Sequence, residues 1–222
     1  MTPWIGDCSL KNSIATSAVL AIACMLSAGC ALLSKSDPLT PRYFTLAGRG
    51  VDTPAMSSSS GTPARQVPPL SLGRVSGAAQ LRERIVYRSG DHEVGYYDDW
   101  RWTERPDVYL RRVLVRTLFE ERRFQQVISG AAPVLQAELL AFEQIRDDPQ
   151  RVRMEVLITL YEGRATRLTE TIGIERPVQE ASGDGHANAV ARAFEEALNA
   201  GVKLAADHVT TILQPARSEG EP

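Results

Sequence analysis

The three histidines are the first residues to consider for chemistry, because an imidazole can bind a metal or transfer a proton. They are His92, His186 and His208, and none of them stands beside cysteines or acids at the usual spacing of metal ligands. We therefore expect these side chains to be solvated or packed. The sequence predicts no metal site.

Adjacent acidic residues are a second candidate for acid–base chemistry, and they occur at Asp98–Asp99, Glu120–Glu121 and Asp147–Asp148. Neighbours in a strand or helix point in different directions, so such pairs cannot easily share a proton. The chain has neither a lysine-bearing phosphate loop nor a Gly-x-Ser-x-Gly nucleophile motif, and the 48–50 segment (GRG) is too short to hold a nucleotide. We expect no enzyme activity and no cofactor apart from a covalent lipid.

That lipid is predicted at Cys30, which follows Leu26, Ser27, Ala28 and Gly29. The segment resembles a bacterial lipobox, although Ser27 stands where leucine is common. Small residues before the cysteine fit a narrow peptidase pocket, and the thiol accepts a thioether-linked lipid. We predict cleavage between Gly29 and Cys30, and lipid attachment at Cys30.

The residues before Cys30 fit a secretory signal peptide over residues 1–29. No charge lies between Lys11 and Lys35, and the intervening apolar run is shorter than the roughly 20 residues of a membrane span. An uncleaved membrane anchor is the alternative. Cys8 and Cys24 would leave with the peptide, so no disulfide is expected.

The lipobox resemblance implies a multiply acylated cysteine, and two or more chains hold a protein firmly at a membrane. Ala31, rather than aspartate, follows the cysteine. In the sorting rule of such lipoproteins this implies the outer membrane, on its periplasmic face. A net charge of −2 gives no electrostatic footprint for nucleic acid.

The rest of the chain predicts an α+β domain, with one mostly antiparallel mixed sheet and two amphipathic helices packed against it. A tether covers 30–40, the domain 41–213 and a polar tail 214–222. Residues 49–66 contain four consecutive serines with several Gly and Pro, and predict a flexible loop. Strands are expected at 42–46, 70–75, 84–88, 93–99, 124–129, 134–142, 152–161 and 168–175, the last four as an antiparallel meander.

Two helices are expected to cover this sheet. The first begins at an N-cap, Thr103, and its apolar face comprises Leu110, Val113, Leu114, Thr117 and Leu118. The second is long, ends before Pro215 and has its apolar face at Val190, Ala193, Phe194, Ala197, Leu198, Gly201, Ala205, Val209 and Ile212.

The densest aromatic cluster is Tyr96, Tyr97, Trp100 and Trp102. One interpretation is packing between a strand and a helix. The other is an exposed partner-binding surface, because Tyr and Trp are enriched at interfaces. Alternation along a strand points Tyr96 and Tyr97 to opposite sides.

Residues 81–88 (LRERIVYR), 93–97 (EVGYY) and 101–106 (RWTERP) resemble the ABC-type transport auxiliary lipoprotein family, whose members include PqiC-like lipoproteins. The resemblance implies a non-catalytic outer-membrane partner of an MCE-type transporter, which moves lipids or other apolar compounds across the periplasm. The implied partners are an MCE-family periplasmic protein with its permease and ATPase. Ring-forming members make a homo-oligomer a further expectation. The alternatives are a structural or assembly lipoprotein of the envelope and a lipoprotein that binds a small ligand.

Overall fold

The computed structural model describes residues 39–46, 67–180 and 182–214. All helices and strands below belong to the unit Pro41–Pro222. The predicted signal peptide, the 49–66 loop and nearly all of the tether and tail lie outside the described residues. So do Gly29 and Cys30, whose roles remain predictions.

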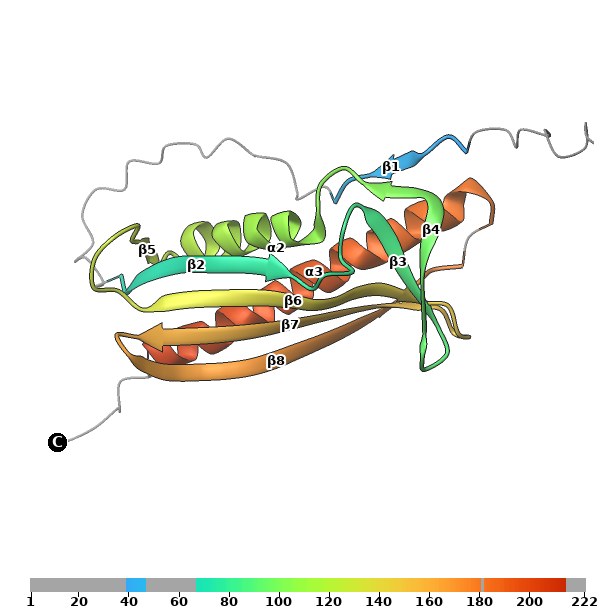
Figure 1. Cartoon of the computed structure of the whole chain (residues 1–222). Helices are drawn as coiled ribbons and strands as arrows, with labels where there is room; N and C mark the ends of the chain where they lie inside the picture. Colours follow the sequence, from blue (N-terminus) through green and yellow to red (C-terminus); the bar gives the residue numbers. More distant parts are fainter. Residues whose placement is uncertain (1–38, 47–66, 181, 215–222) are drawn as a thin grey trace, which may run out of the picture. The chain divides into compact units, whose positions relative to one another are not determined.

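Strand β6 (Val134–Ile145) is the centre of an eight-stranded sheet. On one side it pairs with β7 (Arg151–Glu162), and β7 pairs with β8 (Ala165–Pro177); both pairings are antiparallel and span most of each strand. Figure 1 shows these three long strands side by side. This meander makes the sheet mostly antiparallel, as predicted.

The other edge of β6 is shared by two strands. β2 (Pro69–Gly77) pairs in parallel with its first half, and β3 (Arg84–Ser89) pairs in parallel with its last residues. β4 (Glu93–Trp102) forms an antiparallel hairpin with β3 and also pairs in parallel with β1 (Arg42–Phe44). The predicted 84–88 and 93–99 hairpin is confirmed, and β4 continues to Trp102.

The segment 124–129 is not part of the meander, contrary to our prediction. Only β5 (Gln125–Gln126) is a strand there, and it pairs in parallel with β2 at the sheet edge. The chain therefore passes the edge of the sheet before it enters β6. The meander starts at β6.

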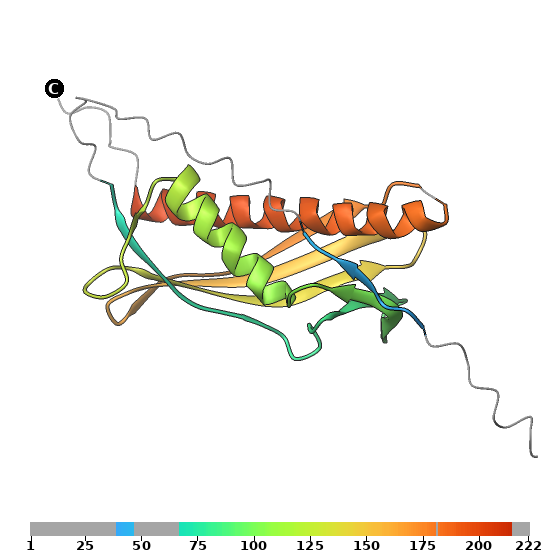
Figure 2. The same cartoon turned by 90° about the horizontal axis from the view of Figure 1, so that it is seen from above.

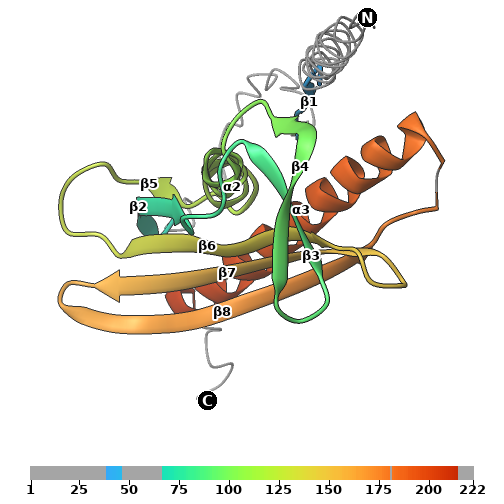
Figure 3. The same cartoon turned by 45° about the vertical axis from the view of Figure 1, so that its right-hand side comes forward.

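Both helices lie on one face of the sheet, as the views from above and from the side show (Figure 2 and Figure 3). α2 (Pro106–Val115) continues into a π-helical segment, η2 (Arg116–Glu121), and α3 (Asp184–Leu213) has 30 residues. Thr103 is not the N-cap: α2 begins after Arg105, with Pro106 in its first turn. The Thr103 hydroxyl instead lies 2.7 Å from the Tyr109 hydroxyl.

The core lies between this helix layer and the sheet. The predicted faces of both helices are buried, except that Ile212 is half-buried. On β7 every second side chain points into the core, and Gly201 of α3 lets the helix approach Met154 of that strand. A shared set of fully buried side chains fills the centre: Leu70, Leu110, Leu135, Leu139, Phe142, Met154, Ile158 and Phe194.

Candidate partner-binding site

The aromatic cluster of β4 lies on a large bulge. Arg84 pairs with Arg101 and Val86 pairs with Tyr96, so β3 advances two residues (84 to 86) while β4 advances five (96 to 101). The three extra residues disrupt the ladder locally, as bulged residues do. The bulge places Tyr97 and Trp100 in positions that a regular strand would not give them.

Two arginines satisfy the carbonyl groups that the bulge leaves without ladder partners. Arg84 donates from its guanidinium to the carbonyl of Tyr97 at 3.3 Å, and Arg101 donates to the carbonyls of Tyr97 and Trp100, both at 3.0 Å. Buried or half-buried backbone carbonyls need such partners. Arg84 and Arg101 therefore hold the bulge in shape.

Trp102 is part of the core. Its side chain is 2% exposed and packs edge-on against Phe194 with ring centroids 5.1 Å apart, with Tyr109 and Phe142 also in contact. No face of the indole is left for a partner. The interpretation of Trp102 as an exposed contact residue is wrong.

Trp100 is buried too, but it supports a surface residue. It is 9% exposed and stacks on Tyr97, with ring centroids 4.0 Å apart and planes inclined by 12°. Phe44 of β1 and His186 of α3 lie against its other sides, at 5.7 and 6.1 Å between centroids. Trp100 thus fixes the position of the Tyr97 ring.

Tyr97 is half-buried, and its hydroxyl donates to Oε1 of Gln144 at 2.6 Å. Gln144 is fully buried and donates in turn to Gln150 at 2.9 Å. Burial raises the pKa of Tyr97, while the nearby cation of Arg146 acts in the opposite direction. The phenol therefore stays neutral and remains a hydrogen-bond donor.

A second tyrosine and an arginine complete the surface around Tyr97. Tyr87 lies across Gly95, where a Cβ atom would be 2.4 Å from the tyrosine ring, and it meets Tyr97 edge-on at 5.2 Å. The guanidinium of Arg146 lies 4.4 Å from the Tyr87 ring centroid and 5.4 Å from that of Tyr97. Cation–π contacts of this kind orient an exposed arginine.

Tyr96 faces different neighbours, as alternation along the strand predicted. The Arg84 guanidinium lies 5.1 Å from its ring centroid, and the Tyr96 side chain is half-buried. We call the set Tyr87, Tyr97 and Arg146 the aromatic–arginine surface; Tyr96 and Arg84 lie on the other face of the hairpin. Arg146 was missed in the sequence because the β6–β7 turn brings it to this surface.

The hairpin that carries this surface is fixed to the sheet by a buried carboxylate. Glu143 of β6, whose side chain is 5% exposed, accepts hydrogen bonds from Arg88 of β3 at 2.9 Å and from Arg153 of β7. The hydrogen bond to Glu143 raises the pKa of Arg88. A buried carboxylate with two cationic partners joins three strands at one point.

The histidines are separate in space. His92 lies in the β3–β4 turn, His186 is near Trp100, and Nδ1 of His208 lies 2.6 Å from a carboxylate oxygen of Glu170. The contact between His208 and Glu170 joins residues 38 apart in the sequence, so it could not be predicted from the spacing of metal ligands. No group of three His, Cys, Asp or Glu that could hold a metal occurs in the described ranges.

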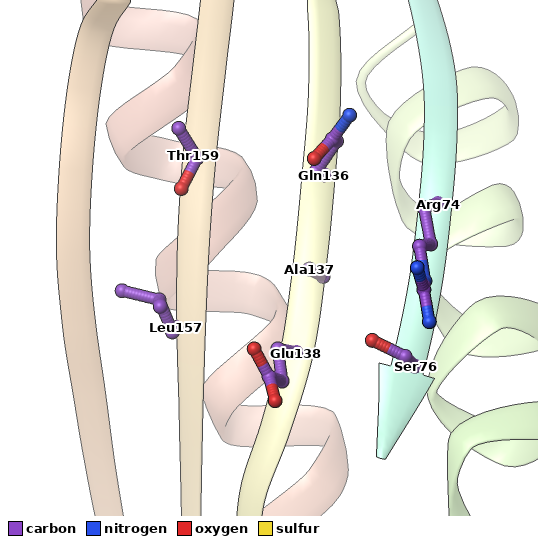
Figure 4. A pocket seen from close by; sticks show the side chains of 7 residues that line it. All are labelled: Arg74, Ser76, Gln136, Ala137, Glu138, Leu157 and Thr159. Carbon is purple, nitrogen blue, oxygen red and sulfur yellow. The ribbon is translucent and has the colours of Figure 1, made fainter. Parts of the chain in front are cut away.

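A shallow hollow of about 320 Å³ lies on the sheet face that is turned away from the helices (Figure 4). It is formed by β2, β6 and β7 and is lined mainly by polar side chains, among them Arg74, Gln136, Glu138 and Thr159. Such a lining does not suit an acyl chain. Each helix among the described residues is too short or too polar to span a bilayer.

Comparisons with known proteins agree with this architecture. A family model described as "ABC-type transport auxiliary lipoprotein component" matches residues 51–200. A crystal structure of a protein from Xanthomonas campestris is similar with a TM-score of 0.57 and 20% identity, over 67% of this chain and 89% of that one.

A second crystal structure, of an uncharacterized protein, has a TM-score of 0.54 and 15% identity, over 77% of this chain and 96% of that one. At these identities the structural likeness shows the fold alone. A search of the curated proteins gave no match.

Proposed function

The chain belongs to the family of ABC-type transport auxiliary lipoprotein components, and from this membership we propose that it is the non-catalytic lipoprotein of an MCE-type ABC transporter. The match over residues 51–200 is the observation that carries the proposal. In this role the protein binds an MCE-family periplasmic protein, which works with its permease and ATPase. Together they move lipids or other apolar compounds across the periplasm.

We further propose that Cys30 bears the lipid after cleavage behind Gly29, and that the protein is held at the periplasmic face of the outer membrane. The small residues before Cys30 and the alanine after it support this location. An acyl anchor places the domain beside the membrane without a spanning segment.

The aromatic–arginine surface is the part of the domain best suited to bind the MCE protein. Tyrosine and arginine are enriched among the residues that dominate binding energy. Here Tyr97 is held by Trp100 and Gln144, and Arg146 is held by two rings, so little side-chain freedom is lost when a partner binds.

The test is to purify tagged full-length protein from detergent-solubilised membranes of its native host and to identify the bound proteins. We expect an MCE protein, a permease and an ATPase. Separation of inner and outer membranes shows whether the complex reaches the outer membrane. Recovery of the lipoprotein in stable form without any transporter subunit would contradict the proposal.

Two surface variants, Tyr87→Ala and Arg146→Ala, locate the contact. Loss of an interface anchor typically costs about 2 kcal/mol or more, which is roughly a 30-fold weaker complex. Tyr43→Ala is the matched control, because Tyr43 is a 65% exposed aromatic residue outside this surface. If all three variants bind the transporter equally, the docking surface lies elsewhere.

A further inference from the structure

The hollow on the open face of the sheet carries polar side chains that the fold itself does not use. Its polar lining residues come from three strands and are Arg74, Ser76, Gln136, Glu138 and Thr159 (Figure 4). Within the described part of the chain, none of these five side chains makes a hydrogen bond or an ion pair, and Arg74 and Glu138 do not pair with each other. Their donors and acceptors are therefore available to a ligand.

The chemistry of this lining suits a neutral ligand with many hydroxyl groups. The volume of about 320 Å³ is in the range of small-ligand sites, roughly 300–1,000 Å³. The guanidinium of Arg74 only donates hydrogen bonds, the carboxylate of Glu138 only accepts them, and the amide of Gln136 does both. A hydroxyl group satisfies each of them, because it is both donor and acceptor. Glu138 repels a simple anion, and Arg74 repels a simple cation.

Apolar side chains beside these polar groups favour sugar rings over other molecules with many hydroxyls. Alternation along β7 puts Leu157, Thr159 and Tyr161 on this face of the sheet, and all three are half-buried. A sugar ring has C–H faces that pack on apolar side chains, while its hydroxyl groups point outward from the rim. Leu157 inside the hollow and the aromatic ring of Tyr161, one step beyond Thr159, offer such contacts.

The strand register sets the polar groups in a row across the sheet. Gln136 of β6 lies opposite Thr159 of β7, which lies opposite Thr169 of β8. Figure 4 shows Arg74 of β2 on the other side of Gln136. Neighbouring strands are about 4.7–4.9 Å apart, and the rings of an extended β-1,4-linked sugar chain repeat at nearly this distance. A chain laid across the strands therefore places about one ring on each of them.

We propose that this hollow binds an extended, neutral chain of β-1,4-linked sugars that runs across β2, β6, β7 and β8. Arg74, Gln136 and Glu138 hydrogen-bond the ring hydroxyls, and Leu157 packs against a ring face. Together with the proposed acyl anchor, such a site would link the membrane to a polysaccharide beside it. The site uses no residue of the aromatic–arginine surface, so it stands or fails separately from the proposed function.

Binding of soluble tetrasaccharides to the full-length protein in detergent micelles tests the site. Chitotetraose and cellotetraose are the probes, because both are β-1,4-linked and only the first carries acetamido groups. Saturation-transfer NMR should detect saturable binding of at least one of them, with empty micelles as the blank. The tighter probe identifies the source as an amino-sugar polymer or a plain glucose polymer. Maltotetraose, whose α-1,4 linkages curl the chain, should bind several-fold more weakly.

Variants of single side chains connect this binding to the hollow. Glu138→Ala removes a charged acceptor and should weaken binding of the tetrasaccharide about tenfold. Thr159→Val removes only a hydroxyl and keeps a β-branched side chain in the strand, so the fold should be retained while binding weakens about fivefold. Glu196→Ala is the matched control, because Glu196 is an exposed acid on α3, in the helix layer, and should bind as the wild type does. Thermal unfolding checks that each variant is folded.

Four results would overturn the proposal. The first is that neither β-linked probe binds, and the second is that folded Glu138→Ala and Thr159→Val proteins bind as tightly as the wild type. The third is equal binding of maltotetraose, which an extended chain across the strands does not allow. The fourth is that glycerophosphoethanolamine displaces the sugar at a lower concentration than the free sugar does, which would assign the hollow to a zwitterionic lipid headgroup.

Discussion

Trp100 and Trp102 are two residues apart on one strand, yet their environments differ because of the bulge before them. Trp102 packs among Phe142 and Phe194, whereas Trp100 meets Tyr97 and the end of β1. Alternation along the strand predicted that the side chains of Tyr96 and Tyr97 point to opposite sides, and their different neighbours agree with this prediction. Of the two arginines that hold the bulge, Arg84 comes from the paired strand β3, so no local pattern could have identified it.

At this scale, Trp102→Ala should lower the free energy of unfolding by about 3 to 5 kcal/mol, since it removes a buried indole and leaves a cavity. Tyr43→Ala should change it by less than about 0.5 kcal/mol, because that ring is largely exposed. Chemical denaturation of the two variants checks the difference. Similar losses would mean that Tyr43 is covered in solution.

Tyr97→Phe should cost about 1 to 3 kcal/mol near neutral pH, because it leaves the buried Gln144 amide without its donor. The substitution should also change how the free energy of unfolding depends on pH. The pKa of Tyr97 is raised above its ordinary value of 10.0, so the unfolded chain ionises first as the pH rises. The stabilisation that neutral Tyr97 gives the folded protein is therefore complete below pH 10, and it is lost as the pH rises above this value.

Denaturant titrations across this alkaline range provide the measurement. The wild-type protein should lose more stability between neutral pH and pH values above about 10 than the Tyr97→Phe variant does. Parallel curves would show that Tyr97 is not perturbed in the folded protein.

At the scale of elements, helical periodicity was the most informative part of the sequence. The predicted apolar face of α2 is buried, because residues three and four apart share one side of a helix. The start of α2 was predicted wrongly, since Thr103 is bonded to Tyr109 instead of capping the helix. The parallel pairing of β2 and β3 with β6 joins segments far apart in sequence, and strand alternation carries no information about that order.

Leu114→Asp should destabilise the domain by more than about 4 kcal/mol, because it puts a charge where the leucine is 1% exposed. Val108→Asp is the matched control: it introduces the same charge on the same helix, at a residue that is 41% exposed and near the N-terminus. The helix dipole stabilises a negative charge near the helix N-terminus. If both variants lose the same thermal stability, Leu114 does not lie on a buried face of α2.

At the scale of the whole molecule, the family, the α+β class and the helix-covered sheet followed from sequence. The open edge of β8 did not, because the sequence does not show which strand lies at an edge. Its one signal was the segment 171–175, in which Thr171, Gly173 and Glu175 alternate with Ile172 and Ile174, as fits a strand with one solvated face.

Cys30→Ala should abolish acylation and release the protein from membranes or leave it as precursor. The reason is that the lipid is the proposed anchor and alanine has no thiol to accept it. Metabolic labelling with a fatty acid, followed by membrane fractionation, measures both effects. Membrane retention of a correctly cleaved Cys30→Ala protein would contradict the anchor.

The short β1 strand has a mechanical consequence for a protein held by its N-terminal side. Tension on that segment reaches the domain at Arg42, where β1 pairs with only the three residues Trp100–Trp102 and is held further by the buried side chains of Phe44 and Leu46. β1 is therefore the first strand of the domain on which this load acts, ahead of the long β6–β8 meander. When single molecules are stretched between their two termini, β1 should therefore detach first and give a small extension before the rest of the domain unfolds. Detachment of β1 would lengthen the segment between the membrane and the domain while the other strands stay folded.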